Sequence, residues 1–341
     1  METRHFSRRR ALAAALAAAL AAVTGCATPR PSEPALLTVI SFGGGFNLPL
    51  WAAREQGFFA REGIAFTLVI TADSKQVFTG LMDGRYQLAM TAFDNIVAYQ
   101  EGQGEVRFEQ PTDFAAVMGS DDGFLSLVAV PEIRTVAELR GRTISVDAMT
   151  NGFAFALREM LARGGVSESD VKWARAGGTD RRYAALMERQ HDATLLRAPF
   201  DLQARNRGFN QLATARDVLG AYLGPVAAVR RSWAEDHPQV VVHFIRAYRD
   251  AVRWLLEPSN RAAAQALLLA NVPGMSAEVA RQSCDLLLDP RTGFFPDVAL
   301  DPRAVASVLA LRSRLGDPPR PLTDPDKYLD RRYWQQAMAG R

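Results

Sequence analysis

Short apolar runs alternate with helical patterns along the first part of the chain. Runs of this kind occupy residues 36–42, 65–70 and 86–90, and a segment with helical spacing follows each of them. Buried parallel strands have this appearance, and the helices between them are crossovers. The pattern therefore predicts an α/β sheet whose strands end in loops of small or polar residues at 43–47, 71–75 and 91–95.

A second α/β unit of the same kind is predicted from residue 124. Its apolar runs lie at 124–130, 143–149, 171–176 and 192–197, and a long apolar segment at 221–229 returns toward the first unit. Beyond residue 238 the apolar positions recur at helical spacing. The sequence predicts an α/β fold of two lobes joined by two crossover strands, with lobe boundaries at 36–123 plus 222–341 for one and 124–221 for the other.

The N-terminal segment has the layout of a secretory signal peptide. A basic stretch precedes an apolar run from Ala11 to Val23, which is shorter than the roughly 20 residues that span a bilayer. Cys26 follows small residues, as in a bacterial lipobox, although an incidental cysteine is the alternative. We expect residues 1–25 to be a signal peptide, Cys26 to be lipidated and residues 26–35 to form a proline-containing tether. The protein would then be anchored to a membrane, in the periplasm or at the cell surface.

Charge and motif content narrow the classes of function. The net charge of +3 comes from the leader, which holds four arginines and one glutamate, so the rest is formally neutral and nucleic acid is not an expected partner. The four histidines show no metal-ligand spacing, and no Gly-x-Ser-x-Gly elbow occurs. The sequence predicts no metal, no cofactor and no catalytic residue.

The candidate ligand-binding residues lie in loops that follow strands. In open α/β sheets such loops face the crevice where ligands bind. The first unit supplies aromatic, amide, hydroxyl and carboxyl groups from Phe46, Asn47, Thr71, Asp73, Thr91, Phe93, Asp94 and Asn95. The second unit and the returning segment supply Thr150, Asn151, Phe153, Arg197 and Tyr222.

Several of these residues have a structural alternative. Asp73 and Asp94 could cap helices instead of binding a ligand. Arg197 could form an ion pair between the lobes, and the three phenylalanines could pack there. The candidate residues include three phenylalanines, two aspartates and asparagine but no lysine, and this set favours a planar nitrogen heterocycle as the ligand.

A set of spaced motifs makes the chain similar to a known family. In the first lobe they are Pro49, Gly57-Phe58-Phe59, Gly63-Ile64, Gly80 and Asp83-Gly84; further on come residues 138–144 (ELRGRTI), Gly164-Gly165-Val166 and Tyr328-Leu329-Asp330. With these motifs the chain resembles the solute-binding lipoproteins of ABC importers, in the group of nitrate, sulfonate, taurine and thiamine-pyrimidine binders.

The resemblance implies a type II periplasmic-binding-protein fold that closes on a ligand in the interlobe cleft. It implies a monomeric, non-enzymatic protein whose partners are a small solute and a membrane permease with its ATPase. A thiamine-precursor pyrimidine is the expected ligand. The alternatives are an anion of the nitrate, sulfonate or taurine type, or an enzyme of the pyrimidine-synthase type on the same fold.

Overall fold

The computed structural model describes residues 33–339, and the chain from Ala35 onward forms one compact unit. The predicted signal peptide, the lipidation site at Cys26 and most of the predicted tether lie outside the described residues. Within residues 33–339, no helix is both long enough and apolar enough to cross a membrane.

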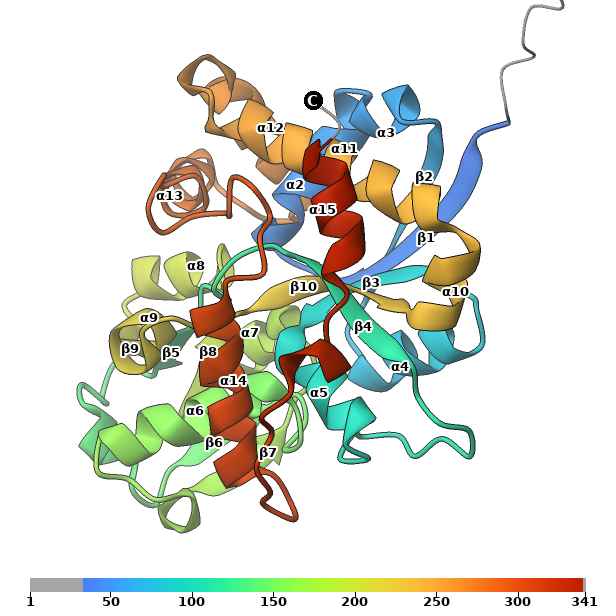
Figure 1. Ribbon diagram of the computed structural model, residues 1–341. Helices are drawn as coiled ribbons and strands as arrows, with labels where there is room; N and C mark the ends of the chain where they lie inside the picture. The colour runs from blue at the N-terminus through green and yellow to red at the C-terminus, as the bar shows by residue number, and fades with distance from the viewer. Residues whose placement is uncertain (1–32, 340–341) are drawn as a thin grey trace, which may run out of the picture. The chain divides into compact units, whose positions relative to one another are not determined.

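The first sheet contains the predicted strands of the first unit (Figure 1). Its strand order is β2-β1-β3-β10-β4, with bounds β1 Ala35–Phe42, β2 Ile64–Thr71, β3 Leu88–Ala92, β4 Phe114–Gly119 and β10 Pro225–Arg230. Its crossover helices are α2 Leu48–Glu55, α3 Phe58–Arg61, α4 Ser74–Met82 and α5 Phe93–Gln100, and a 3₁₀ turn, η1, spans Gly45–Asn47. We call this sheet and these helices lobe 1.

The second sheet has the same plan, with strand order β7-β6-β8-β5-β9. The bounds are β5 Ser126–Ala129, β6 Thr143–Val146, β7 Lys172–Arg175, β8 Ala193–Leu196 and β9 Asn210–Thr214. Its helices are α6 Gly152–Arg163, α7 Thr179–Met187 and α8 Phe200–Asn206, with 3₁₀ turns η2 Val136–Leu139 and η3 Glu168–Asp170. We call this sheet and these elements lobe 2.

Two connections join the lobes, and each delivers an antiparallel strand. β5 follows the first connection and runs antiparallel to β8, while β10 follows the second and runs antiparallel to β3. A strand that enters a sheet from the opposite lobe runs against strands whose carboxyl ends face that lobe. The connections themselves are not strands: residues 120–125 are irregular, and the second contains an unpredicted helix, α9 Ala215–Leu219.

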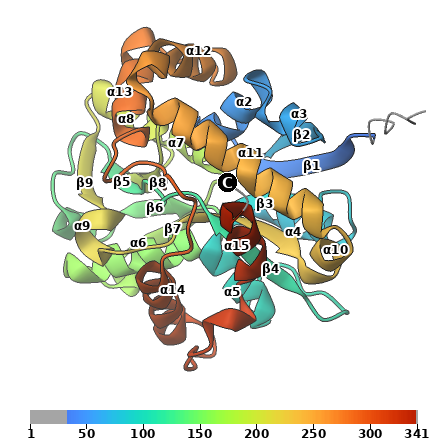
Figure 2. The same cartoon turned by 45° about the horizontal axis from the view of Figure 1, so that its top comes forward.

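After β10 the chain is helical, as the apolar spacing predicts. The elements are α10 Arg231–Asp236, α11 Pro238–Leu256, η4 Pro258–Asn260, α12 Arg261–Asn271, α13 Ala277–Leu287, α14 Pro302–Leu315, η5 Pro325–Lys327 and α15 Arg331–Ala339. α11 and α15 pack together beside lobe 1, whereas α14 lies against α5 and α6 (Figure 2).

The two connections touch at a pair of glycines, Gly123 and Gly224. A Cβ at Gly224 would lie 2.2 Å from the backbone nitrogen of Gly123. Gly224 also donates its N–H to Asp121 O at 3.0 Å and accepts from Phe93 N at 2.9 Å. Backbone is therefore in direct contact with backbone where the lobes are joined.

We expect Gly224→Ala to lower the free energy of unfolding by about 1–3 kcal/mol, because the added methyl must push one connection away from the other. Urea unfolding at neutral pH measures the change. Gly43→Ala is the matched control, since its Cβ would meet Ile70 at an ordinary contact distance of 3.6 Å. Equal losses in the two variants would contradict the assigned backbone contact.

Candidate ligand-binding site

A cavity of about 50 Å³ lies between the lobes, where strands of both sheets end. Lobe 1 and the connections contribute Phe42, Phe46, Met90, Thr91, Ala92, Asn95, Ser120 and Pro225. Lobe 2 and the residues after β8 contribute Ser145, Val146, Asp147, Asn151, Phe153, Ala154, Leu157, Gly178, Thr179, Arg182, Leu195 and Arg197. A volume of this size has room for a few water molecules or one small solute.

On the lobe 1 side, Thr91 and Asn95 form a hydrogen-bonded pair. β3 ends at Ala92, and α5 begins at the next residue, so both side chains lie at the carboxyl end of a strand. Asn95 Nδ2 donates to Thr91 Oγ1 at 3.0 Å, and Asn95 Oδ1 accepts from Gly152 N of lobe 2 at 3.2 Å. The amide of Asn95 therefore links the cavity wall of lobe 1 to that of lobe 2.

On the lobe 2 side, a carboxylate and an amide follow β6. Asn151 caps α6, because its Oδ1 accepts from Ala154 N at 2.9 Å, and its Nδ2 donates to Asp147 Oδ2 at 3.1 Å. Burial raises the pKa of Asp147 above the usual aspartate range, although the positive charge of Arg182 and a hydrogen bond from Ser74 act in the opposite direction. Asp147 is the carboxylate in this wall that could accept from a ligand N–H.

Arg182 is the buried cation of lobe 2 at the cavity. It lies on α7, and its guanidinium donates to Gly177 O at 2.6 Å, Leu195 O at 3.2 Å and Thr179 Oγ1 at 3.3 Å. Its Nε has no hydrogen-bond partner among the described residues. A buried donor without a partner carries a free-energy cost that a ligand acceptor could remove.

Arg197 is also buried at the cavity, but its charge is already paired. Its Nη2 lies 3.0 Å from Asp121 Oδ1, and its Nε donates to Gly123 O. The guanidinium carbon lies 3.7 Å from the centre of the Phe46 ring. Of the two readings of Arg197, the ion pair between lobe 2 and the first connection is therefore confirmed.

The lobes contact each other directly around the cavity. Gly45 N of lobe 1 donates to Ala198 O at 3.1 Å, and Gly178 N of lobe 2 donates to Ala72 O at 3.1 Å. Together with the bond between Gly152 and Asn95, these contacts hold the two walls together. The described conformation is one in which the lobes are closed on the cavity.

The structure separates the predicted site residues into two groups. The residues that line the cavity are Phe46, Thr91, Asn95, Asn151, Phe153 and Arg197. The residues that lie elsewhere are Asn47, Thr71, Asp73, Phe93, Asp94, Thr150 and Tyr222.

The second group has structural partners. Asn47 bonds to Ser41 Oγ and to the carbonyls of Phe42 and Gly44. Asp73 is the N-cap of α4, as its structural alternative predicts. The remaining partners are Gln76 for Thr71, Glu105 for Thr150, Arg312 for Asp94 and the Gly152 carbonyl for Tyr222.

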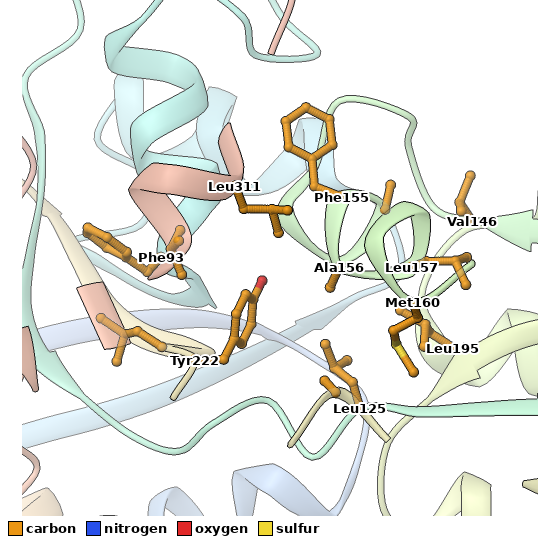
Figure 3. Packing of buried hydrophobic residues seen from close by; sticks show 14 of the residues in the cluster. Phe93, Leu125, Val146, Phe155, Ala156, Leu157, Met160, Leu195, Tyr222 and Leu311 are labelled. Atoms are coloured by element: carbon orange, nitrogen blue, oxygen red, sulfur yellow. The ribbon is translucent and has the colours of Figure 1, made fainter. Parts of the chain in front are cut away.

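The position expected for Phe93 in a loop is wrong. α5 begins directly after β3 without a loop, so Phe93 points into the core instead of the cleft. Figure 3 shows it packed with Tyr222, whose hydroxyl is buried in the same cluster. The aromatic wall of the cavity comes instead from Phe46, Phe153 and Phe42, the last residue of β1.

Asp147 and Arg182 line the cavity but are not among the site residues predicted from the sequence. Asp147 was not predicted because the strand expected at 143–149 is too long. β6 ends at Val146, so Asp147 is the first residue beyond a strand. The strand-end rule used for lobe 1 would have found it. Arg182 lies inside a helical segment, and nothing in the local sequence shows that its side chain reaches the cavity.

Comparison with solved structures gives the class of fold. The ligand-binding component of an ABC-type import system from Staphylococcus aureus, with zinc bound, matches with a TM-score of 0.72, 13% identity and coverage of 89% of this chain and 99% of that one. The alkanesulfonate-binding protein SsuA of Xanthomonas axonopodis pv. citri, bound to MOPS, matches with a TM-score of 0.68, 21% identity and coverage of 86% and 96%. The desulfurization enzyme DszB matches with a TM-score of 0.61, 15% identity and coverage of 89% and 99%. The fold is the two-lobed type II periplasmic-binding-protein fold.

A family assignment follows from the sequence. Residues 47–262 match the family model described as NMT1/THI5 like. The match covers more than half of the chain, so the protein belongs to the NMT1/THI5-like family. No curated protein sequence matches the chain.

Proposed function

We propose that the protein is the extracytoplasmic solute-binding component of an ABC importer. The observation that carries the proposal is the cavity between the lobes, to which both lobes contribute hydrogen-bonding side chains. A hinge-like closure of two lobes captures a solute and changes the surface presented to a partner. The fold shared with an ABC-type import component and with an alkanesulfonate-binding protein supports this function.

The proposal includes delivery of the solute to a membrane permease with its ATPase and anchoring through lipidated Cys26. The basic and apolar leader before Cys26 supports export. A tethered receptor remains close to its transporter, so capture and delivery occur at the same membrane. Mass analysis of the membrane-extracted protein would detect lipid on Cys26, and an unmodified Cys26 would contradict the anchor.

For the ligand, we propose a small planar nitrogen heterocycle such as a thiamine-precursor pyrimidine. Phe42, Phe46 and Phe153 supply aromatic surface at the cavity, and Asp147 and Asn151 supply acceptors for ring or amino N–H groups. Hydrogen bonds of this kind fix the orientation of a flat ligand that apolar contact alone would not fix.

A sulfonate-type anion is the second candidate, because Arg182 carries the unpartnered buried Nε described above. The alkanesulfonate bound by SsuA makes this class of ligand a natural member of the test panel. The two classes differ in what they require of Asp147: a heterocycle uses it as an acceptor, and an anion is repelled by it.

Asp147→Asn separates these classes. We expect this substitution to lower the affinity for a heterocycle or amine by about 10–100-fold, because a hydrogen bond to a charged group contributes about 1.5–3 kcal/mol. The same variant should bind an anion more tightly, because the repelling carboxylate is removed. Isothermal titration measures both changes, and Asp324→Asn is the control, since the Asp324 carboxylate caps η5 and does not line the cavity. An unchanged heterocycle affinity in Asp147→Asn would exclude the proposed acceptor.

An enzyme on this fold remains a candidate because one side-chain pair has the spacing of a nucleophile and a base. Ser145 Oγ, at the cavity, lies 3.0 Å from His191 Nε2. Burial and the charge of Arg182 lower the pKa of His191 to about 4, which makes it a weak base at neutral pH. Turnover that is lost in Ser145→Ala would establish the enzyme.

The first experiment is native mass spectrometry on protein lacking residues 1–25 and with Cys26 replaced, followed by a thermal-shift screen of pyrimidines and sulfonates. A solute at a hundredfold excess over its Kd should stabilise the protein by about 2.7 kcal/mol. A stoichiometric small molecule released intact supports solute binding. Chemical conversion of the compound would replace the transport proposal with the enzymatic one.

A further inference from the structure

Helix α14 is held by lobe 1 at both ends. Before it, Gly119 N of β4 donates to Val298 O at 2.9 Å. After it, Ala116 of β4 donates to Tyr328 O at 2.9 Å and accepts from Asp330 N at 2.8 Å. Between these two attachments the helix packs on α5 of lobe 1 and on α6 of lobe 2, and Figures 1 and 2 both show it beside α6. α14 therefore belongs to lobe 1 by its attachments and also contacts lobe 2.

Arg312 is the buried centre of this contact. Its side chain is 1% exposed and forms a two-pronged ion pair with Asp94, which is 3% exposed, with Nε–Oδ1 at 2.8 Å and Nη2–Oδ2 at 2.5 Å. Nη1 donates to Gln103 Oε1 at 2.9 Å, also in lobe 1. Nη2 also donates to Thr150 O of lobe 2 at 2.7 Å, and the guanidinium lies over the Phe155 ring of α6 at 4.3 Å.

The groups that Arg312 holds are direct neighbours of cavity residues. Asp94 precedes Asn95 in α5, and Thr150 precedes Asn151, so one guanidinium fixes both walls from behind. The Asn95 side chain accepts from Gly152 N between these two points. Arg312 itself does not line the cavity.

We infer that Arg312 is a positioning residue of the binding site, which couples the Asp94–Asn95 turn of lobe 1 to the Thr150–Gly152 segment of lobe 2 and so maintains the closed lobes. Its relevance to solute affinity rests on the proposed function. The role of Arg312 in holding the lobes closed does not rest on that proposed function. A planar guanidinium is suited to this role because it can serve acceptors on two lobes at once.

Two variants weaken this coupling by different routes. Arg312→Lys keeps the charge opposite Asp94 but replaces the fork with a single point charge that cannot bond Asp94, Gln103 and Thr150 together. Gly152→Ala keeps every charge, but its Cβ would lie 2.4 Å from Asp94 Cβ, across the lobe boundary. Within α6 alone, alanine is favourable for the helix, so the clash is with lobe 1.

The experiment compares ligand-free protein by small-angle X-ray scattering and by amide hydrogen exchange, well below the unfolding temperature. We expect a larger radius of gyration in both variants and exchange of the residue 152 amide about tenfold faster or more, since its hydrogen bond to Asn95 Oδ1 crosses the lobe boundary and loss of the Arg312 bond to Thr150 alone corresponds to about that factor. Arg303→Gln is the control on the same helix, because Arg303 is 86% exposed and pairs with its neighbour Asp301.

A residue with a purely structural role would change the unfolding temperature without changing scattering or this local exchange. Wild-type scattering and exchange in both variants would overturn the inference, whatever the protein binds. Because neither readout needs a ligand, failure of the solute-binding proposal would leave the result interpretable. If a solute has been identified, both variants should also release it faster than the wild type and Arg303→Gln.

Discussion

Replacing Arg197 with methionine is expected to lower the free energy of unfolding by about 3–5 kcal/mol at neutral pH. The Arg197 and Asp121 side chains are 4% and 1% exposed, and their charges lie 3.0 Å apart. Removal of the guanidinium leaves the Asp121 carboxylate buried with donors from Ser120 and Gly123 but without a counter-charge. Such an uncompensated buried charge costs far more than the loss of a surface ion pair.

Urea unfolding of the purified protein measures this effect, and two further variants define its origin. Arg54→Met removes an exposed ion pair with Glu55 and should cost less than about 1 kcal/mol. The double variant Arg197→Met with Asp121→Asn removes both charges and should recover much of the lost stability. A double variant as unstable as Arg197→Met itself would show that the lost packing on Phe46, and not the unpaired charge, dominates.

The Arg197 pair illustrates what local sequence can and cannot determine. The apolar run before Arg197 predicts a strand, and the strand-end rule places its side chain at the cleft. Its partner lies 76 residues earlier in the chain, in a connection whose position depends on the packing of both lobes. The sequence therefore leaves a ligand acid and an interlobe ion pair as equal readings, and only the tertiary contact decides between them.

The order of strands and helices could be predicted well because each buried strand is a short apolar run with polar residues after it. The first and last residues of the helices and strands were predicted less accurately. These boundaries decide whether a side chain points into the core or toward the cavity. α5 begins at Phe93, inside the predicted loop 91–95, and this start turns Phe93 into the core and Asp94 toward α14, while Asn95 remains at the cavity. The Asp94 carboxylate instead pairs with Arg312, which lies 218 residues further along the chain, so local sequence could not show this contact.

The second large effect is expected from pH. Burial and the nearby positive charge of Arg182 lower the pKa of His191 to about 4, with Asp192 acting weakly in the opposite direction. An unfolded chain binds a proton at this residue near pH 6.5. Between these values the unfolded state binds a proton that the folded state does not, so the contribution of neutral His191 to stability is present above pH 6.5 and is lost as pH falls toward 4. From pH 7 to pH 5 the loss amounts to about 2 kcal/mol.

Buried aspartates with raised pKa values, Asp147 and Asp201 among them, have the opposite pH dependence, so the wild-type curve alone does not isolate His191. The comparison is therefore with His191→Gln, which removes the titrating group and retains a side chain able to bond Ser145. Urea unfolding at pH 7 and pH 5 should show a drop in the wild type that exceeds the drop in His191→Gln by about 2 kcal/mol. His237→Gln, on the surface, should retain the wild-type difference because His191 is intact. Equal drops in wild type and His191→Gln would mean that His191 is hydrated in solution, which would also remove the reason for regarding it as a weak base beside Ser145.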